Sequence, residues 1–192
     1  MYQLKLNGRA PAGIVNGTAE PIIATGAIIS DIPMIDGVES SLIRTGDDVG
    51  LNADEGVLEI ENVAEKHVVT CILRNKGKIL LLRRSSEVGS YRGRWAGVSG
   101  FIERGEKDSE AARRELREEI GRGKARLAKN IEPRMFRDGA TTWVVHPFLF
   151  DVGDRKVRLD WEHAAFEWIS PSEMTDYPTV PGLEQIVCKL LE

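Results

Sequence analysis

Residues 100–121 read GFIERGEKDSEAARRELREEIG, and this stretch decides how the chain is expected to fold. Its second half predicts a helix over about Ser109–Ile120, in which aliphatic residues recur every four positions. Asp108 or Ser109 is suited to cap the start of this helix, and Gly121 stands where a left-handed residue commonly follows a helix. We therefore expect one helix with an apolar stripe on one side and charged side chains on the other.

Three glutamates crowd one edge of this predicted helix. Side chains three and four residues apart are neighbours on a helix, so Glu115, Glu118 and Glu119 lie together, and Glu106 arrives from the preceding loop. Each like-charge pair at such spacing costs roughly 0.2–0.5 kcal/mol on an exposed helix, and more in a cleft of low dielectric constant. Because Mg²⁺ prefers oxygen ligands, the cluster predicts a bound divalent cation.

The same stretch resembles the signature of a known enzyme family. Nudix hydrolases carry the pattern G-x5-E-x7-R-E-U-x-E-E-x-G-U, in which U is aliphatic and x is any residue. The matching positions here are Gly100, Glu106, Arg114, Glu115, Leu116, Glu118, Glu119 and Gly121. The last position holds Arg122 in place of an aliphatic residue. Since the glycine, the arginine and all the glutamates stand at their offsets, the resemblance rests on a specific motif.

The resemblance implies a role for each of these polar residues. The expected catalytic set is Arg114, Glu106, Glu115, Glu118 and Glu119. The expected metal ligands are the main-chain carbonyl of Gly100 and the carboxylates of Glu115, Glu118 and Glu119. The cofactor is expected to be Mg²⁺, for which Mn²⁺ can substitute. Within this set, the resemblance implies that Arg114 orients Glu106.

Substrate contacts are predicted on both sides of the motif, and the candidates are Arg84, Arg94, Trp95 and Glu162. The two arginines are the choices for substrate phosphates, because a guanidinium group donates paired hydrogen bonds and stays charged. Trp95 could stack on a base, and the alternative is a buried ring that braces the loop. Three glutamates are candidates for the general base: Glu115, Glu119 and Glu162.

The surrounding sequence predicts an α/β domain. Two β-rich runs, Val68–Leu73 and Lys78–Leu82, flank a turn at Asn75–Gly77 and predict a hairpin. Two further strands and a final amphipathic helix are expected at Thr141–Val152, Arg155–Leu159 and about Pro181–Leu191. The family resemblance covers residues 66–192 and implies an α/β/α sandwich around a mixed sheet.

Residues 1–62 form a second predicted domain, which is β-rich, with turn signals between short apolar runs and almost no helical pattern. Residues 9–22 and 31–60 resemble parts of the swivelling phosphohistidine domain of phosphoenolpyruvate-utilising enzymes, and related swivel modules occur in aconitase-like dehydratases. The loop that carries the phosphorylated histidine is missing, so phosphotransfer is not expected. We therefore expect two domains, 1–62 and 66–192, and the role of the first stays open.

Global properties predict a soluble, cytoplasmic protein. No apolar run in the 192 residues approaches the ~20 residues of a membrane span, and no signal-peptide core is evident. A net charge of −4 argues against binding to a nucleic-acid duplex. Cys71 and Cys188 are expected to be buried thiols without metal-ligand spacing. The expected partner is a small-molecule diphosphate, without membrane or nucleic-acid contacts, and a homodimer is left open.

These patterns predict a Mg²⁺-dependent pyrophosphohydrolase. Its expected substrate is a nucleoside diphosphate linked to another moiety, with nucleoside triphosphates and ADP-ribose-like compounds as the leading choices. One alternative is a non-catalytic, nucleotide-binding regulatory module. The other is an enzyme similar to isopentenyl-diphosphate isomerase, which shares the fold and needs a catalytic cysteine in a suitable loop.

Overall fold

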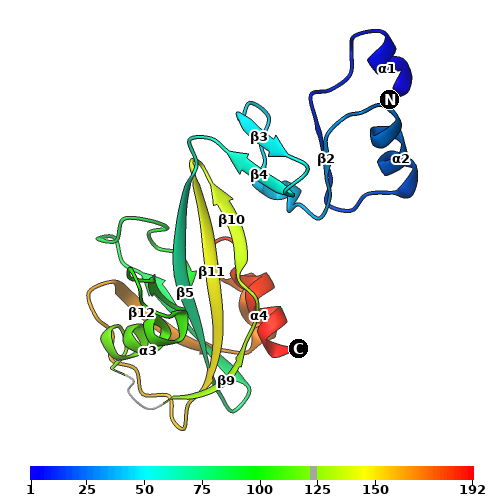
Figure 1. The fold of residues 1–192 in the computed structure, drawn as a ribbon. Coiled ribbons are helices and arrows are strands. Elements are labelled where there is room, and N and C mark those ends of the chain that lie inside the picture. The colour runs from blue at the N-terminus through cyan, green and yellow to red at the C-terminus, as the bar shows by residue number, and fades with distance from the viewer. Residues whose placement is uncertain (122–124) are drawn as a thin grey trace. The chain divides into compact units, whose positions relative to one another are not determined.

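The computed structural model describes residues 1–121 and 125–192. The chain folds as two compact units, Met1–Ala64 and Glu65–Glu192, each with its own secondary structure (Figure 1). Arg122, where the motif departs from its usual pattern, lies outside the described residues. Within those two described ranges, no helix is long and apolar enough to cross a membrane.

The first unit contains helices, so the expectation of a β-rich unit with almost no helix was wrong. Helix α1 spans Tyr2–Leu6, α2 spans Pro21–Ile29, and the 3₁₀ helix η1 spans Ser40–Leu42. The run PIIATGAII gives no helical pattern because its apolar residues mark no single helical face, and isoleucine is common in strands. Pro21 nevertheless begins α2 at a position where its missing N–H removes no helical hydrogen bond.

The strands of the first unit are short and form two separate sheets. β1 (Ile14–Val15) pairs in parallel with β2 (Met34–Ile35). Helix α2 lies between them in the chain, because two parallel strands need a long crossover connection. β3 (Val49–Asn52) and β4 (Val57–Ile60) form an antiparallel hairpin. The unit is therefore a small mixed module.

An eight-stranded sheet forms the body of the second unit. Its strands are β5 (Ala64–Asn75), β6 (Lys78–Arg84), β7 (Trp95–Ala96), β8 (Val98–Phe101), β9 (Arg126–Asn130), β10 (Arg134–Asp138), β11 (Thr141–Asp151) and β12 (His163–Ile169). The main path runs β10-β11-β5-β6-β12, while β7 pairs with β6, β8 with β5 and β9 with β11. Both β8 and the start of β12 thus lie near the central strands β5 and β6.

The predicted hairpin and the long predicted strand are confirmed. β5 and β6 pair antiparallel through a two-residue turn, in which Lys76 and Gly77 have φ values of 47° and 75°. Positive φ at both positions matches the twist of the flanking strands. β11 occupies the predicted run almost completely. Each strand therefore begins and ends within two or three residues of the predicted position, except that β5 starts four residues early.

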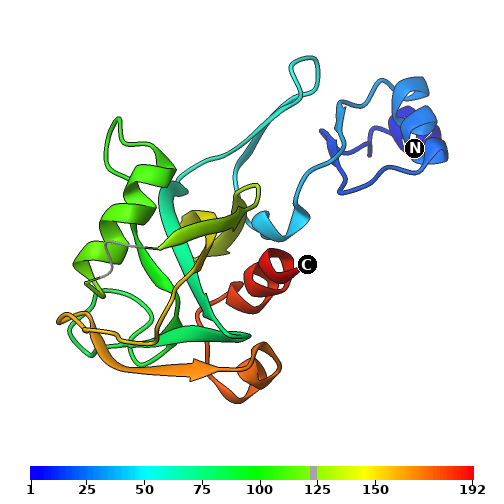
Figure 2. The ribbon, with the colours of Figure 1, turned by 90° about the horizontal axis from the view of Figure 1, so that it is seen from below.

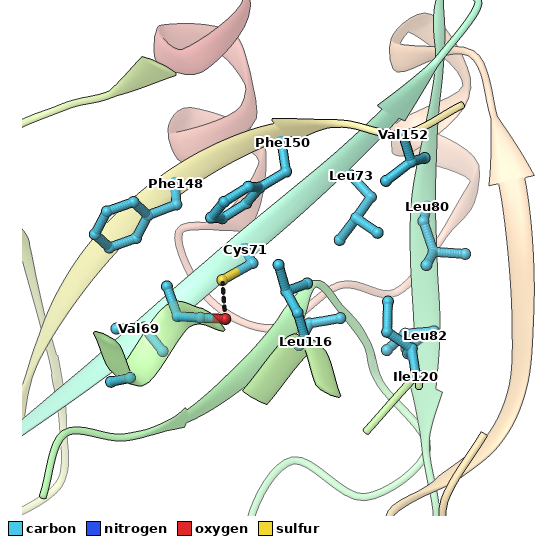
Figure 3. Packing of buried hydrophobic residues seen from close by; sticks show 13 residues of the cluster. Val69, Cys71, Leu73, Leu80, Leu82, Leu116, Ile120, Phe148, Phe150 and Val152 are labelled. Carbon is cyan, nitrogen blue, oxygen red and sulfur yellow. Dashed lines mark hydrogen bonds between the residues drawn. The ribbon is translucent and has the colours of Figure 1, made fainter. Parts of the chain in front are cut away.

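Two helices cover opposite faces of this sheet, which confirms the α/β/α sandwich (Figure 2). Helix α3 (Asp108–Glu118) packs on one face with Val69, Cys71 and Leu73 of β5, where the Cys71 Sγ lies 3.7 Å from the Ala112 carbonyl oxygen (Figure 3). Helix α4 (Leu183–Leu191) packs on the other face, where Ile72 of the same strand points. The alternation along β5 therefore builds two cores.

Several boundaries differ from the sequence-based expectations. Helix α3 is preceded by Lys107, whose backbone N–H donates to the Glu110 carboxylate, so neither Asp108 nor Ser109 is the cap. Residues 155–159 form no strand, so that prediction was wrong, and the Arg155 guanidinium binds the side chain and carbonyl of Asn75. The 3₁₀ helix η2 (Pro171–Asp176) follows β12. Cys188 is exposed on α4, which corrects its expected burial.

Candidate active site

A cavity of about 400 Å³ lies in the second unit beside α3 and β8. Its wall includes four of the predicted catalytic or metal-binding residues, which are Gly100, Arg114, Glu115 and Glu118. They converge because β8 ends at Phe101 and the chain turns back into α3, whose residues contact β8. The motif is therefore assembled from a strand and the helix that follows it.

Gly100 lets Glu115 lie directly against the backbone of β8. A Cβ atom built at position 100 would overlap the carboxylate of Glu115. Only glycine therefore permits this close approach of strand and helix. As a result, the main chain of Gly100 and the carboxylate of Glu115 occupy the same part of the cavity wall.

The Arg114 guanidinium joins the acidic side chains of the motif. Its Nε and Nη2 donate to the two carboxylate oxygens of Glu106 at 3.0 and 2.9 Å, and Nη2 also donates to the Phe101 carbonyl at 2.9 Å. Its Nη1 donates to Glu115 Oε1 at 2.5 Å and to Glu118 Oε2 at 3.3 Å. The expected contact between Arg114 and Glu106 is present, and it fixes the loop before α3 to the helix.

Glu118 and Glu119 are neighbours in sequence but differ in their surroundings. The side chain of Glu118 is 59 % exposed and lines the cavity. Glu119 follows the last residue of α3, is 3 % exposed and is not part of the cavity wall. One of its oxygens, Oε1, accepts the backbone N–H of Ser99 at 3.3 Å. The structure thus brings Glu115 and Glu118 to the wall and places Glu119 behind it.

Burial and mutual repulsion disfavour the charged forms of two of these glutamates. Burial raises the pKa of Glu115, and the charges of Glu118 and Glu162 raise it further, although Arg114 acts in the opposite direction. Burial also raises the pKa of Glu119 well above its usual range, with further contributions from Glu115, Glu162 and Asp160. The site therefore has an excess of negative charge that a cation would relieve.

The residues present fit a divalent cation. Glu119 Oε2 is buried without a hydrogen-bond partner among the described residues, which is rare for a carboxylate oxygen. In ranges 1–121 and 125–192 no three His, Cys, Asp or Glu side chains form a ready-made cage, and Arg114 donates hydrogen bonds to both Glu115 and Glu118. Mg²⁺ does not require such a cage, since it keeps several waters and also binds substrate phosphates.

The four predicted substrate residues separate into three groups. Arg84 and Glu162 line the cavity, and the Arg84 Nε donates to the Ser90 carbonyl at 2.9 Å. Arg94 lines a second, smaller cavity of about 280 Å³ and donates to the Thr179 carbonyl at 3.3 Å. Trp95 lines neither; it is 9 % exposed and packs edge-on against Tyr177, with ring centroids 5.2 Å apart. Its assignment to substrate stacking is therefore corrected to a role in the core.

An aromatic wall of the cavity was missed by the sequence analysis. It consists of Tyr91, Phe101, Phe136 and Trp143. The ring of Trp143 is close to those of both Tyr91 and Phe101, with centroids 6.4 and 6.1 Å away. Phe101 is 56 % exposed, an unusual position for a large apolar ring. The four rings come from four separate segments of the chain, so only the fold brings them together.

His163 is not among the predicted site residues, because the sequence favours an exposed turn at residues 162–163. The structure buries it at the first position of β12, 6 % exposed. Its Nδ1 lies 3.1 Å from Asp160 Oδ1, and its Nε2 lies 3.6 Å from Glu119 Oε2. Burial lowers the pKa of His163, although Asp160 acts in the opposite direction. No sequence signal distinguishes this histidine from an exposed one.

This fold and motif define a hydrolase of phosphoanhydride bonds. Residues 65–190 match the NUDIX domain, and the chain belongs to the Nudix family. A similar solved structure is the MutT protein from Methanosarcina mazei Go1, which is 25 % identical with a TM-score of 0.57 and matches 67 % of this chain and 94 % of that one. A C. elegans Ap4A hydrolase shares the fold at 20 % identity, with a TM-score of 0.53, over 66 % of this chain and 94 % of that one.

The first unit matches a different swivel domain from the expected one. Residues 1–60 match the aconitase X swivel domain, so the assignment to a phosphoenolpyruvate-utilising swivel domain was wrong. They are 52 % identical over 61 residues to the phosphomevalonate dehydratase small subunit of Thermococcus onnurineus, covering 32 % of this chain and 47 % of that protein. The chain thus spans about half the length of the curated relatives that it matches.

Proposed function

We propose that this protein is a Mg²⁺-dependent hydrolase that cleaves a nucleoside diphosphate linked to another moiety. The observation that carries the proposal is a single cavity that is lined both by Glu115 and Glu118 and by aromatic residues that include Trp143. The acidic side suits a cation and a diphosphate, and the aromatic side suits a planar base. A cavity of about 400 Å³ is within the usual range for a small-molecule site.

Each residue of the motif has a part in this proposal. Glu118, Glu115 and Glu119, together with the carbonyl of Gly100, would hold the cation. When bound, Mg²⁺ supplies charge compensation for the diphosphate and lowers the pKa of a ligand water. Arg114 keeps the loop of Glu106 against α3 through its paired hydrogen bonds.

Substrate orientation and proton transfer are assigned to side chains of the same cavity. Arg84 would bind phosphate oxygens, because its guanidinium lies at the cavity and stays charged. A general base must reach the attacking water. Of the three candidates, Glu115 and Glu162 lie on the cavity wall and Glu119 does not, so the first two are proposed.

The aromatic wall supports a nucleoside as the linked group. Aromatic side chains stack on bases, and such stacking contributes about 1–3 kcal/mol per base. We choose Trp143 as the main stacking ring, since it contacts the rings of both Tyr91 and Phe101. The C. elegans neighbour is named an Ap4A hydrolase, which is consistent with nucleotide derivatives as the substrate class for this fold.

A second candidate substrate class follows from the first unit. The relatives of residues 1–60 are named for the dehydration of phosphomevalonate, and a branched aliphatic diphosphate also fits an apolar cavity wall. The isomerase alternative is less favoured, because it needs a catalytic cysteine. Cys71 is buried and neither Cys71 nor Cys188 lines the cavity.

A hydrolysis screen tests the proposal. Purified full-length protein is incubated with Mg²⁺ and with nucleoside triphosphates, ADP-ribose, Ap4A or isopentenyl diphosphate, and the products are separated by ion-exchange chromatography. We expect cleavage of a nucleotide derivative that stops when Mg²⁺ is chelated and is lost in Glu118→Gln. Cleavage of the isoprenoid compound alone would favour the second class. Nucleotide-induced thermal stabilisation without turnover of any compound would instead support the regulatory module.

A further inference from the structure

A buried pair of residues stands behind Glu119, outside the motif. His163 and Glu119 have side chains that are 1 % and 4 % exposed, with His163 Nε2 and Glu119 Oε2 3.6 Å apart. The other ring nitrogen, Nδ1, lies 3.1 Å from Asp160 Oδ1. Asp160 Oδ1 also accepts the backbone N–H of Glu162 at 3.0 Å. Asp160, His163 and Glu119 thus form a continuous row that ends at the proposed cation site.

The backbone is shaped locally to direct His163 inwards. His163 is opposite Arg84 in β6, yet Ala165 is already opposite Arg83, so Ala164 is an extra residue in β12. Such a bulge changes the direction of a side chain in a strand, and bulges are common beside active sites. Ala164 itself is exposed, while His163 is buried. The irregularity therefore places the imidazole where it meets Glu119.

His163 is excluded from direct contact with substrate. Its ring is buried and is not part of the cavity wall, whereas its neighbour Glu162 is. The functional group that His163 approaches is the Glu119 carboxylate, whose Oε1 is already fixed by the Ser99 N–H. The ring therefore limits the positions open to Oε2, the oxygen without a hydrogen-bond partner. Of the three proposed carboxylate ligands of the cation, Glu119 is the one that His163 approaches.

We propose that His163, supported by Asp160, is a positioning residue that holds the Glu119 carboxylate in the orientation needed to bind the cation. This inference rests on the proposed cation site and adds two residues that the Nudix motif does not contain. Groups that orient a metal ligand from behind usually change metal affinity by about 10–100-fold when they are removed. The expected effect is therefore on cation affinity, with little change in folding.

Manganese binding in the absence of substrate tests this proposal. Free Mn²⁺ is measured by electron paramagnetic resonance in titrations of the wild-type chain, His163→Leu and His163→Gln. We expect Mn²⁺ affinity to fall by about tenfold or more in His163→Leu and to recover in part in His163→Gln, whose amide can approach Glu119. His67→Gln, at an exposed histidine of β5, is the matched control and should bind as the wild type does.

Thermal unfolding of the same variants separates positioning from a purely structural role. If His163→Leu keeps wild-type Mn²⁺ affinity, or if its affinity falls only in proportion to unfolded protein, the proposal is overturned. Should His163→Leu fail to fold, Asp160→Asn takes its place, and an unchanged Mn²⁺ affinity in that variant overturns the proposal equally. Wild-type protein that binds no Mn²⁺ would overturn the cation site itself, so the two failures can be told apart.

Discussion

Arg114 holds Glu106 with two parallel hydrogen bonds, from Nε at 3.0 Å and from Nη2 at 2.9 Å. The positive charge of the same guanidinium compensates part of the negative charge of the Glu115 carboxylate, which is buried. Hydrogen bonds from Arg114 lower the pKa of Glu106, so this carboxylate stays ionised and bound. One residue thereby fixes the loop before α3 and keeps two glutamates in place.

Replacing Arg114 by lysine is therefore expected to lower both stability and turnover. A lysine ammonium cannot form the paired contact, and Glu115 loses part of its compensation. We expect about 1–3 kcal/mol less stability in urea unfolding, and a kcat reduced about tenfold or more. Arg117→Lys, at an exposed position of the same helix, is the control. Equal stability and equal kcat in Arg114→Lys and Arg117→Lys would contradict this role of Arg114.

Glu119→Gln is expected to stabilise the metal-free protein at neutral pH. The pKa of Glu119 is raised in the folded state, so its ionised form opposes folding once the pH exceeds the unfolded value of about 4.3. A neutral glutamine removes this unfavourable charge, and its amide oxygen can still accept the backbone N–H of Ser99. With EDTA at pH 7.5 we expect Tm to rise by at least about 2 °C, and the difference should vanish near pH 4.

The same variant should lose its response to the cation. Added Mg²⁺ is expected to raise the Tm of the wild-type chain and to leave that of Glu119→Gln nearly unchanged. A Tm of the metal-free variant below that of the wild type at pH 7.5 would contradict the assigned electrostatics.

Trp143→Ala is expected to weaken substrate binding. Loss of stacking should raise KM about tenfold or more for a nucleotide substrate and leave kcat nearly unchanged, because the base is bound alike in ground and transition states. Trp161 is 63 % exposed and lies outside the cavity, so Trp161→Ala serves as the control. Unchanged KM in Trp143→Ala would favour a substrate without a base.

Glu118→Gln should lower kcat by at least about a hundredfold without affecting the fold, as expected when a metal ligand is lost. The Glu118 side chain is 59 % exposed, so its replacement disturbs little packing. Glu132→Gln changes an exposed glutamate between β9 and β10 and should keep full activity. Steady-state rates with saturating Mg²⁺ provide the comparison, and wild-type rates in Glu118→Gln would count against the site.

The central part of the second unit could be predicted because local patterns determine it. The 3.6-residue period of α3 and the two-residue turn at Lys76 and Gly77 need no distant contact to be recognised. The prediction of a strand at residues 155–159 was wrong, and this segment takes part in a contact with a distant part of the chain. The Arg155 side chain in this segment binds the Asn75 side chain, a contact between residues 80 positions apart in the chain.

The parts of the site that sequence analysis missed depend on tertiary structure. Trp143 and Phe101 become neighbours through the sheet, and neither belongs to the motif. His163 lies beside a bulge in β12, and no residue type in this segment predicts that bulge. In the first unit, the isoleucines of α2 favour a strand locally, and the crossover between two parallel strands overrides that preference.

The central claim is that the glutamates of α3 and the residue after it hold a divalent cation at the cavity. Its most direct test is the dissociation constant of Mn²⁺, measured by electron paramagnetic resonance for the wild-type chain and for Glu118→Gln at pH 7.5. The account predicts saturable binding to the wild type and binding at least about tenfold weaker in the variant. Equal affinity in the two proteins, or no binding to the wild type, would contradict it.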